Sequence, residues 1–356
     1  MRLYNQFCSL LLALLVLPAA ALSAQAPPSD APLMTIHVTV DDHSGHPVAG
    51  LAKDDFTLLD NKKPQSIAEL RPVTGEQTKV IIVLDAVNLP YTVVSFARQQ
   101  LDQFFSANDG RLPQPTTLAV VQDTGTQIRP DFTTDGNELR TSLDHFSIGL
   151  RDLRRSSGFY GADERMQVSL RAFDALMGQR TFTGPTRIIW VSPGWPLLSG
   201  PAVELSKSQA NLIFNDVVAL TTQLRALHVV VDAVNPVGAG QDVAQTYYFE
   251  SFLHAPRSAH DAEIGDLGLQ VIAVQSGGQV LNGSNDIAGL LRRALEQTKD
   301  AYQLSFTPAP GDRTNEYHEL QLKVRRPGLT VHTSGGYYAR PSVPSLPPAT
   351  AASSAH

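Results

Sequence analysis

Residues 79–90, KVIIVLDAVNLP, decide the fold of this chain. The apolar run that ends at Leu84 is typical of a buried strand, and it closes on a carboxylate, Asp85, before a loop broken by Pro90. In an open α/β sheet the ligand crevice lies at the carboxyl ends of the strands. Asp85 therefore stands where such a fold would hold a metal ion or a polar ligand.

Downstream of this strand the sequence alternates between buried strands and amphipathic helices. Apolar residues recur every three or four positions in each expected helix, as a helix packed on a sheet requires. This alternation predicts a mostly parallel sheet with helices on both faces. The expected strands are residues 80–85, 117–122, 187–191, 228–234 and 279–281, and the expected helices are about 93–105, 135–145, 166–177, 213–227, 264–274 and 287–295.

The α/β domain is expected to span residues 77–300. In the two regions that flank it, apolar and polar side chains alternate as they do in half-buried strands. Residues 34–76 predict a small unit of short strands that is too small to be stable alone, so we expect it to pack on another part of the chain. Residues 301–340 predict further strands that pack on this unit or on the α/β domain. The proline-rich residues 25–33 indicate a linker, and the Pro/Ser/Ala-rich residues 341–356 indicate a disordered tail.

The N-terminus has the order of a secretory signal peptide: a positive charge at Arg2, a short apolar run, and then small residues. We expect residues 1–24 to be this signal and the protein to be exported, to the periplasm or outside the cell. The apolar run is too short to span a bilayer comfortably, and no second long apolar segment follows. The single cysteine, Cys8, lies inside the signal, so the mature chain is expected to fold without disulfides and without a membrane span.

Composition excludes some classes of function. Of the 356 residues 42% are hydrophobic and 17% are charged, which is typical of a folded globular protein. The formal net charge of −6 argues against nucleic acid as a partner, because phosphate binding needs a basic surface. The sequence contains neither the zinc-binding pattern H-E-x-x-H nor the nucleophile pattern G-x-S-x-G. We therefore expect a protein that is not an enzyme, and a hydrolase with an unrecognised site is the least favoured alternative.

The chain resembles the von Willebrand factor type A superfamily, and within it the secreted bacterial VWFA-related proteins that are abundant in Acidobacteria. The resemblance is carried by KVIIVLDAVN at the first sheet strand, by VTVDDHSGHPVAGLAKDDFTLLDNKKPQSIAEL before it, and by VIAVQSGGQVLNGSNDIAGLLRRALEQTKDAYQLSFTP and VRRPGLTVHTSGGYYA near the end. It implies a Rossmann-like α/β core flanked by β strands from both termini. It implies little about activity.

Metal-binding members of this superfamily hold a divalent cation with Asp-x-Ser-x-Ser after the first strand, a threonine from a second loop and an aspartate from a third. Here Val87 and Leu89 stand at the serine positions, and Pro193 stands where the aspartate would be. Hydrocarbon offers no oxygen to a hard cation. We expect a degenerate site without a cofactor, in which Asp85 accepts backbone N–H groups. The alternative is a Mg²⁺- or Ca²⁺-dependent adhesion site whose ligands would be Asp85, Asn88, Thr133 and Thr134.

The most favoured function is thus a secreted binding or adhesion-like module for an unknown protein or cell-surface partner. Exposed aromatic residues are common anchors of interfaces. A possible partner surface combines Trp195 and Pro196, from the loop after the strand ending at Val191, with Asn88 and Leu89. The sequence is equally compatible with the opposite interpretation, in which the indoles of Trp190 and Trp195 are buried in the core.

Overall fold

The structure is a computed structural model that describes residues 32–74, 78–146, 159–178, 182–196, 204–237 and 247–341. These residues belong to one compact unit that begins at Leu33. The expected signal peptide, nearly all of the linker and nearly all of the tail lie outside the described residues.

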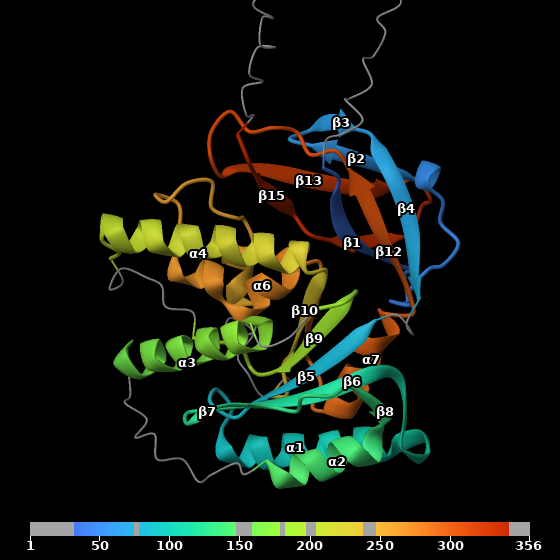
Figure 1. The fold of residues 1–356 in the computed structure, drawn as a ribbon, viewed down its shortest axis with the longest axis vertical. Helices are drawn as coiled ribbons and strands as arrows, with labels where there is room; N and C mark the ends of the chain where they lie inside the picture. The colour runs from blue at the N-terminus through green and yellow to red at the C-terminus, as the bar shows by residue number, and fades with distance from the viewer. Residues whose placement is uncertain are drawn as a thin grey trace, which may run out of the picture. The chain divides into compact units, whose positions relative to one another are not determined.

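A twisted, mostly parallel sheet forms the centre of the α/β domain (Figure 1). Its strands follow the order β11-β10-β9-β5-β6-β7, and β8 pairs with β6 beside β7. Without β8, this is the 3-2-1-4-5-6 order of a doubly wound sheet, which confirms the expected Rossmann-like core. The strands are β5 (Lys79–Asp85), β6 (Arg111–Gln122), β7 (Gly125–Ile128), β8 (Thr133–Asp135), β9 (Thr186–Val191), β10 (Val229–Val234) and β11 (Val280–Leu281). The strand order reverses between β5 and β9, so a ligand crevice is expected where these two strands end.

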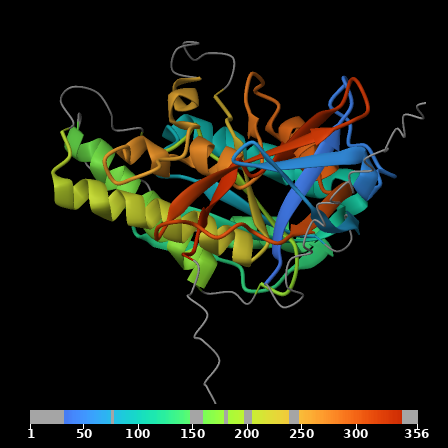
Figure 2. The same ribbon diagram turned by 90° about the horizontal axis from the view of Figure 1, so that it is seen from above.

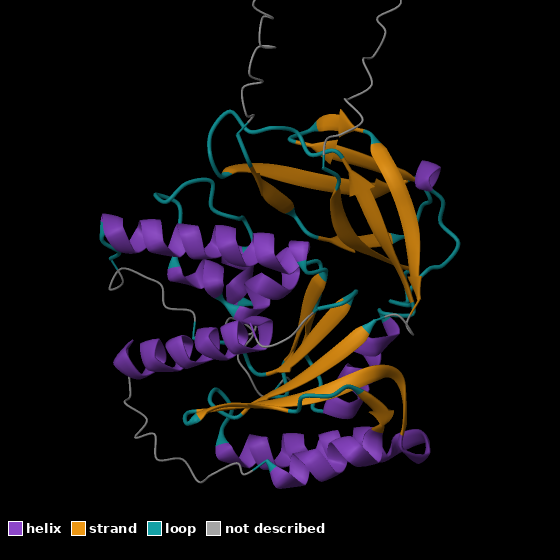
Figure 3. Cartoon of the chain, viewed as in Figure 1, coloured by secondary structure: helices purple, strands orange, loops and turns teal. Residues whose placement is uncertain are grey.

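Helices cover both faces of this sheet, as Figure 3 shows. One face packs on α1 (Tyr91–Ser106), α2 (Gly136–His145) and α7 (Ile287–Glu296). The other packs on α3 (Phe159–Gly178), α4 (Lys207–Ala226) and α6 (Leu269–Gln275). The described residues also form short 3-10 turns: η1 (Lys53–Asp55), η3 (Ala107–Gly110), η5 (Tyr248–Phe252) and η6 (Ile264–Leu267).

Strands from the two ends of the chain together form a β-sandwich, and Figure 2 shows the blue and red strands side by side. One sheet has the order β14-β1-β12-β4 and the other β15-β13-β2-β3. Apolar residues of both sheets fill the space between them, including Val38, Leu58 and Leu304. The strands are β1 (Met34–Asp41), β2 (Phe56–Asp60), β3 (Lys63–Gln65), β4 (Ile67–Thr74), β12 (Asp300–Phe306), β13 (Glu316–Val324), β14 (Thr330–Thr333) and β15 (Gly336–Ala339).

Two stretches that the sequence predicts as single elements are each divided in the structure. The single helix expected over residues 264–274 is a 3-10 turn and a helix, because Gly268 between them has an extended backbone. The stretch expected to close the fold, residues 331–339, is two strands in two different sheets, β14 beside β1 and β15 beside β13. The chain passes between the sheets at Ser334 and Gly335.

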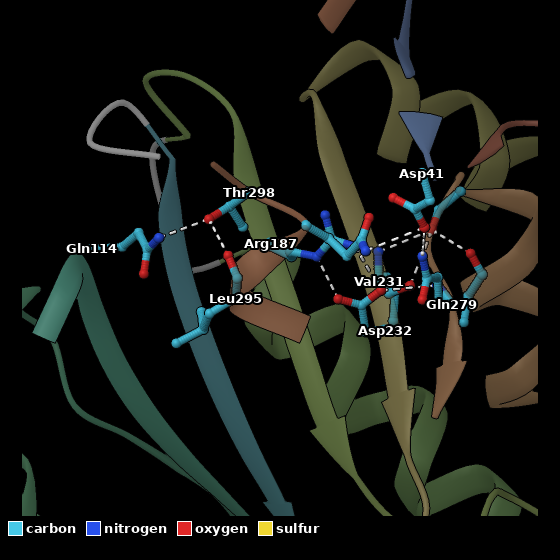
Figure 4. Close-up of polar contacts among 11 residues, drawn as sticks. Asp41, Gln114, Arg187, Val231, Asp232, Gln279, Leu295 and Thr298 are labelled. Carbon is cyan, nitrogen blue, oxygen red and sulfur yellow. Dashed lines mark hydrogen bonds and ion pairs between the residues drawn. The ribbon is translucent and has the colours of Figure 1, made fainter. Parts of the chain in front are cut away.

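Buried polar groups fasten the sandwich to the α/β domain (Figure 4). Arg187 of β9 donates to both carboxylate oxygens of Asp232 of β10, and these residues are 2% and 0% exposed. The backbone N–H of Gln279 donates to Asp232 Oδ1 at 2.9 Å, while its side-chain amide reaches Asp41 Oδ2 of β1 at 3.5 Å. Gln297 Nε2 also donates to Asp41 Oδ2, at 3.3 Å. This cluster therefore links strands of both halves where no apolar contact could fix the register as tightly.

Candidate functional site

The carboxyl end of β5 places Asp85 in the interior of the protein, at 0% exposure. Its Oδ1 accepts the backbone N–H groups of Val87 and Asn88, each at 3.0 Å. Its Oδ2 accepts the side-chain amide of Asn88 at 2.8 Å and the indole N–H of Trp190 at 3.1 Å. A carboxylate offers about four lone-pair positions. Protein donors therefore occupy all of the hydrogen-bonding capacity of Asp85.

Asn88 connects this carboxylate to helix α3. Its Nδ2 also donates to Ser169 Oγ at 2.9 Å, and that hydroxyl in turn donates to the carbonyl of Arg165 at 2.9 Å. Asn88 Oδ1 is buried and has no hydrogen-bond partner. The amide group thus holds the loop against the helix, and its own oxygen is left without a donor.

The positions that would hold serines in a metal-binding type A domain contain buried hydrocarbon. Val87 is 3% exposed and packs in the core on one face of the sheet. Leu89 is 0% exposed and packs in the core on the opposite face. The loop from Val87 to Leu89 is consequently pinned into both cores, and neither side chain can supply an oxygen.

The third loop, after β9, is closed by its own contacts. Ser192 is buried, and its Oγ accepts the backbone N–H of Gly194 at 3.2 Å. The carbonyl of Pro193 accepts Gln270 Nε2 at 3.0 Å. Gly194 has φ +112°, and a Cβ there would lie 2.0 Å from the Gln270 amide nitrogen. Glycine is therefore required where this loop meets helix α6.

Thr133 and Thr134, the expected threonine ligands, lie at the wrong end of the sheet. Thr133 pairs with Thr116 of β6, and Thr116 pairs with Val80 at the start of β5. The residues from Val80 to Asp85 span about 16 Å at the usual rise of a strand. The Thr133 hydroxyl instead accepts the backbone N–H of Asp135, the residue that caps helix α2. Neither threonine can join Asp85 in one coordination sphere, so this expectation was wrong.

The residues present do not fit the divalent cation of metal-binding type A domains. Asp85 has no lone pair left, its neighbours Val87 and Leu89 are apolar, and the threonines are remote. Among the described residues no group of three or more His, Cys, Asp or Glu side chains is placed to hold a metal ion. Within the residues that the structure describes, this edge therefore offers no set of oxygen ligands for a cation.

Two members of the expected partner surface are also buried, which corrects that part of the prediction. Leu89 is 0% exposed, and Trp195 is 3% exposed. The Trp195 ring packs edge-on against Trp190 at 5.2 Å and against Phe173 of α3 at 6.1 Å. The apolar area of the indoles thus stabilises the core, as the second of the two sequence interpretations requires. Of the four residues, only Asn88 and Pro196 keep partial exposure.

Two features of this edge could not be predicted from the sequence, namely the contact of Trp190 with Asp85 and the exposure of two tyrosines. Trp190 reaches Asp85 from a neighbouring strand because β9 pairs in parallel with β5, a register that the chain alone does not reveal. The exposed aromatic residues are tyrosines rather than tryptophans: Tyr91, at the start of α1, is 52% exposed and Tyr160, at the start of α3, is 82% exposed. Both helices begin on the side of the sheet where the strands end.

Comparisons with known proteins give structural likenesses only. No family model and no curated protein matches the chain. The mussel byssus proximal thread matrix protein 1 is 13% identical over 64% of this chain, with a TM-score of 0.31, and the match covers 49% of the mussel protein. The Rpn10 VWA domain is 11% identical over 61% of this chain and 95% of its own length, with a TM-score of 0.29. The manganese-loaded Plasmodium vivax TRAP protein is 10% identical over 79% of this chain and 99% of its own, with a TM-score of 0.28.

The neighbours thus include a von Willebrand factor type A domain. The Rossmann-like core rests on the strand order of the structure itself. Within the part of the chain that the structure describes, no helix is both long enough and apolar enough to cross a bilayer.

Proposed function

We propose that this protein is a non-enzymatic binding module that recognises a protein or cell-surface partner without a metal ion. The observation that carries the proposal is the saturation of Asp85, whose carboxylate accepts four hydrogen bonds from the protein itself. A cation would have to displace donors that are buried and fixed by helix α3 and strand β9, at a large cost in unpaired polar groups. Recognition at this edge then depends on the shape and polarity of the surface.

The arrangement of acid, imidazole and hydroxyl groups also supports a binding role over catalysis. Asp60, His318 and Tyr337 form a hydrogen-bonded cluster, with 2.8 Å from His318 Nδ1 to Asp60 Oδ1 and 2.6 Å from the Tyr337 hydroxyl to Asp60 Oδ2. Their exposed fractions are 4%, 6% and 1%. A substrate has no access to a cluster enclosed in this way, so its role is to hold β2, β13 and β15 together.

The export that the N-terminal sequence predicts belongs to the same proposal, since a binding module for a cell-surface partner acts outside the cytoplasm. N-terminal sequencing of the protein from periplasmic and culture fractions tests this part. A mature N-terminus between residues 21 and 26 is expected. Recovery of the intact N-terminus from the cytoplasm would contradict it.

Thermal unfolding with and without cations tests the metal-free site. The unfolding midpoint is expected to be the same in EDTA and in millimolar Mg²⁺, Ca²⁺ or Mn²⁺, because only a ligand of the native state raises it. A rise in Mn²⁺ that disappears in Asp85→Ala would establish the cation-dependent alternative.

A photo-crosslinking amino acid at Tyr91 tests the binding surface. The residue is exposed beside the Asp85 loop, and tyrosine is a common interface anchor. We expect the same adducts with secreted and surface proteins of the source cells in EDTA and in Mg²⁺, and none from the matched position Lys323, which is exposed on β13 of the sandwich. Adducts that require Mg²⁺, or that form equally from Lys323, would overturn the proposal.

A further inference from the structure

A second cleft lies where the sandwich meets the α/β domain, and it shares no residue with the Asp85 site. Its volume is about 460 Å³, within the range of about 300–1,000 Å³ that is usual for small-molecule sites. One wall is the segment that holds His254 and Arg257, and the other is strand β13 with Tyr317 and Glu319. Figure 1 shows β13 and β15 above helices α4 and α6 in this region.

The loop wall of this cleft is fixed in place by two hydrogen-bond donors from neighbouring elements. Gln275 Nε2, at the end of α6, donates to the carbonyl of Leu253 at 2.7 Å. The Tyr338 hydroxyl, from β15, donates to the carbonyl of Pro256 at 2.9 Å. These two anchors hold the segment on both sides of His254 and Ala255. A ligand therefore meets a wall that is already formed, and little ordering free energy opposes its binding.

The strand wall is equally well defined. The Tyr317 ring packs edge-on against Tyr338, with 5.3 Å between ring centroids. Gly336 makes room for it, since a Cβ there would lie 2.4 Å from the Tyr317 hydroxyl oxygen. Burial raises the pKa of Tyr317 to about 12, and its hydroxyl, like that of an ordinary tyrosine, is protonated at neutral pH and can donate. Leu320, next along β13, packs in the sandwich core, so the apolar lining of the cleft is the Tyr317 ring with Leu253 and Ala255.

The charges in the cleft are one of each sign. Arg257 Nη2 lies 3.9 Å from Glu319 Oε2, and the two side chains are 69% and 37% exposed. An exposed ion pair at this distance contributes little to stability, so a ligand can replace it without a large loss. A ligand with only a negative charge would be repelled by Glu319, and a ligand with only a positive charge would be repelled by Arg257. A ligand with both charges satisfies both residues.

We propose that this cleft binds a small zwitterion, a free apolar amino acid or dipeptide. Arg257 receives the carboxylate in charge-assisted hydrogen bonds, Glu319 receives the ammonium group, and the side chain lies against the Tyr317 ring, Leu253 and Ala255. The proposal does not depend on the metal-free binding function, because the two sites have no residue in common.

Calorimetric titration of the full protein with a matched set of ligands tests the proposal. The set is L-leucine, N-acetyl-leucine, which keeps only the anion, leucinamide, which keeps only the cation, and glucose as a neutral polyol. We expect L-leucine to bind and each blocked form to bind at least about tenfold more weakly, since each loses a charge-assisted contact. Equal binding of the blocked forms, binding of glucose instead, or no heat with L-leucine would overturn the assignment.

Surface variants provide the second arm. Arg257→Gln and Glu319→Gln are each expected to weaken L-leucine binding about tenfold. Arg326→Gln removes another ion pair, with Asp55, just beyond the end of β13, and is expected to leave binding unchanged. Thermal unfolding of each variant checks that the fold is retained. Should one variant fail to fold, the ligand set on the unaltered protein still decides.

Discussion

At the scale of single residues, Asp85 acts as a joint between elements. Its four donors are the backbone N–H groups of Val87 and Asn88, the side-chain amide of Asn88 and the indole N–H of Trp190 in β9. Asn88 extends the connection to Ser169 of α3. A strand-end carboxylate can thus become a structural group when its neighbours supply N–H groups instead of oxygens.

Replacing Asp85 is predicted to destabilise the protein strongly and independently of cations. Asp85→Ala leaves buried donors unpaired, and Asp85→Asn points an N–H₂ group at other donors, so we expect a loss of about 3 kcal/mol in either case. Urea unfolding in EDTA and in Mg²⁺ measures this. Asp54→Ala, at an exposed acid, is the control and should change little. A loss that appears only with Mg²⁺ present would contradict the prediction.

His37 is predicted to make the protein sensitive to acid. Burial, together with the charge of Arg187 and the nearby His228, lowers its pKa to about 3. Because the unfolded chain binds the proton at a higher pH than the native state does, stability is complete above about pH 6.5 and falls as the pH drops toward 3. Urea unfolding at pH 7 and at pH 4.5 measures this. The free energy of unfolding should fall between these two pH values by about 2 kcal/mol less in His37→Gln than in the parent protein. His254→Gln, at an exposed histidine, should behave like the parent.

At the scale of elements, the sequence predicts burial better than pairing. The apolar runs and the helical periodicity place the central strands and helices, because both patterns report which faces avoid water. They do not report partners. The expected closing segment, residues 331–339, therefore becomes two strands of two sheets. The short strands β7 and β8 carry too few residues for a pattern to emerge.

The candidate site follows the same division. That Val87 and Leu89 offer no oxygen ligand after Asp85 was visible in the sequence, since residue type alone decides it. The position of Thr133 was not visible, because it depends on the antiparallel pairing of β8 with β6. The burial of Trp195 depends on Phe173, which lies in a helix elsewhere in the chain.

The Arg187–Asp232 pair, which joins β9 to β10, is predicted to be more costly to break than to remove. Arg187→Met alone leaves a buried carboxylate uncompensated and should cost about 3–5 kcal/mol. The double variant Arg187→Met with Asp232→Leu should recover part of that loss, although the Gln279 N–H then lacks its acceptor. A double-mutant cycle in urea measures both values. Additive losses would show that the pair does not act as a unit.

At the scale of the whole molecule, the sandwich makes the two ends of the chain one structural unit. β12 lies between β1 and β4, so the C-terminal strand is central to a sheet that otherwise comes largely from the N-terminal region. Thr35 and Ser305, which are 270 positions apart, share a hydrogen bond of 2.8 Å. Damage at one end is therefore expected to reach the other.

Leu304→Ala tests this coupling. Leu304 is 0% exposed in the sandwich core, and its truncation should cost about 2–5 kcal/mol. Hydrogen exchange measured by mass spectrometry should then accelerate in β1 and β4 as well as in β12, and much less in β5. Leu212→Ala, at a residue 61% exposed on α4, is the matched control. Faster exchange confined to β12 would show that the strands open separately.

Because β1 pairs with β12, β1 cannot form its sheet until most of the chain has been synthesised. A ribosome makes the first of these strands long before the second, so the early strand must wait without its neighbours while most of the polypeptide is produced. Its unpaired backbone invites association with other chains during that interval. We therefore expect the nascent chain, and any product that ends before β12, to be prone to aggregation.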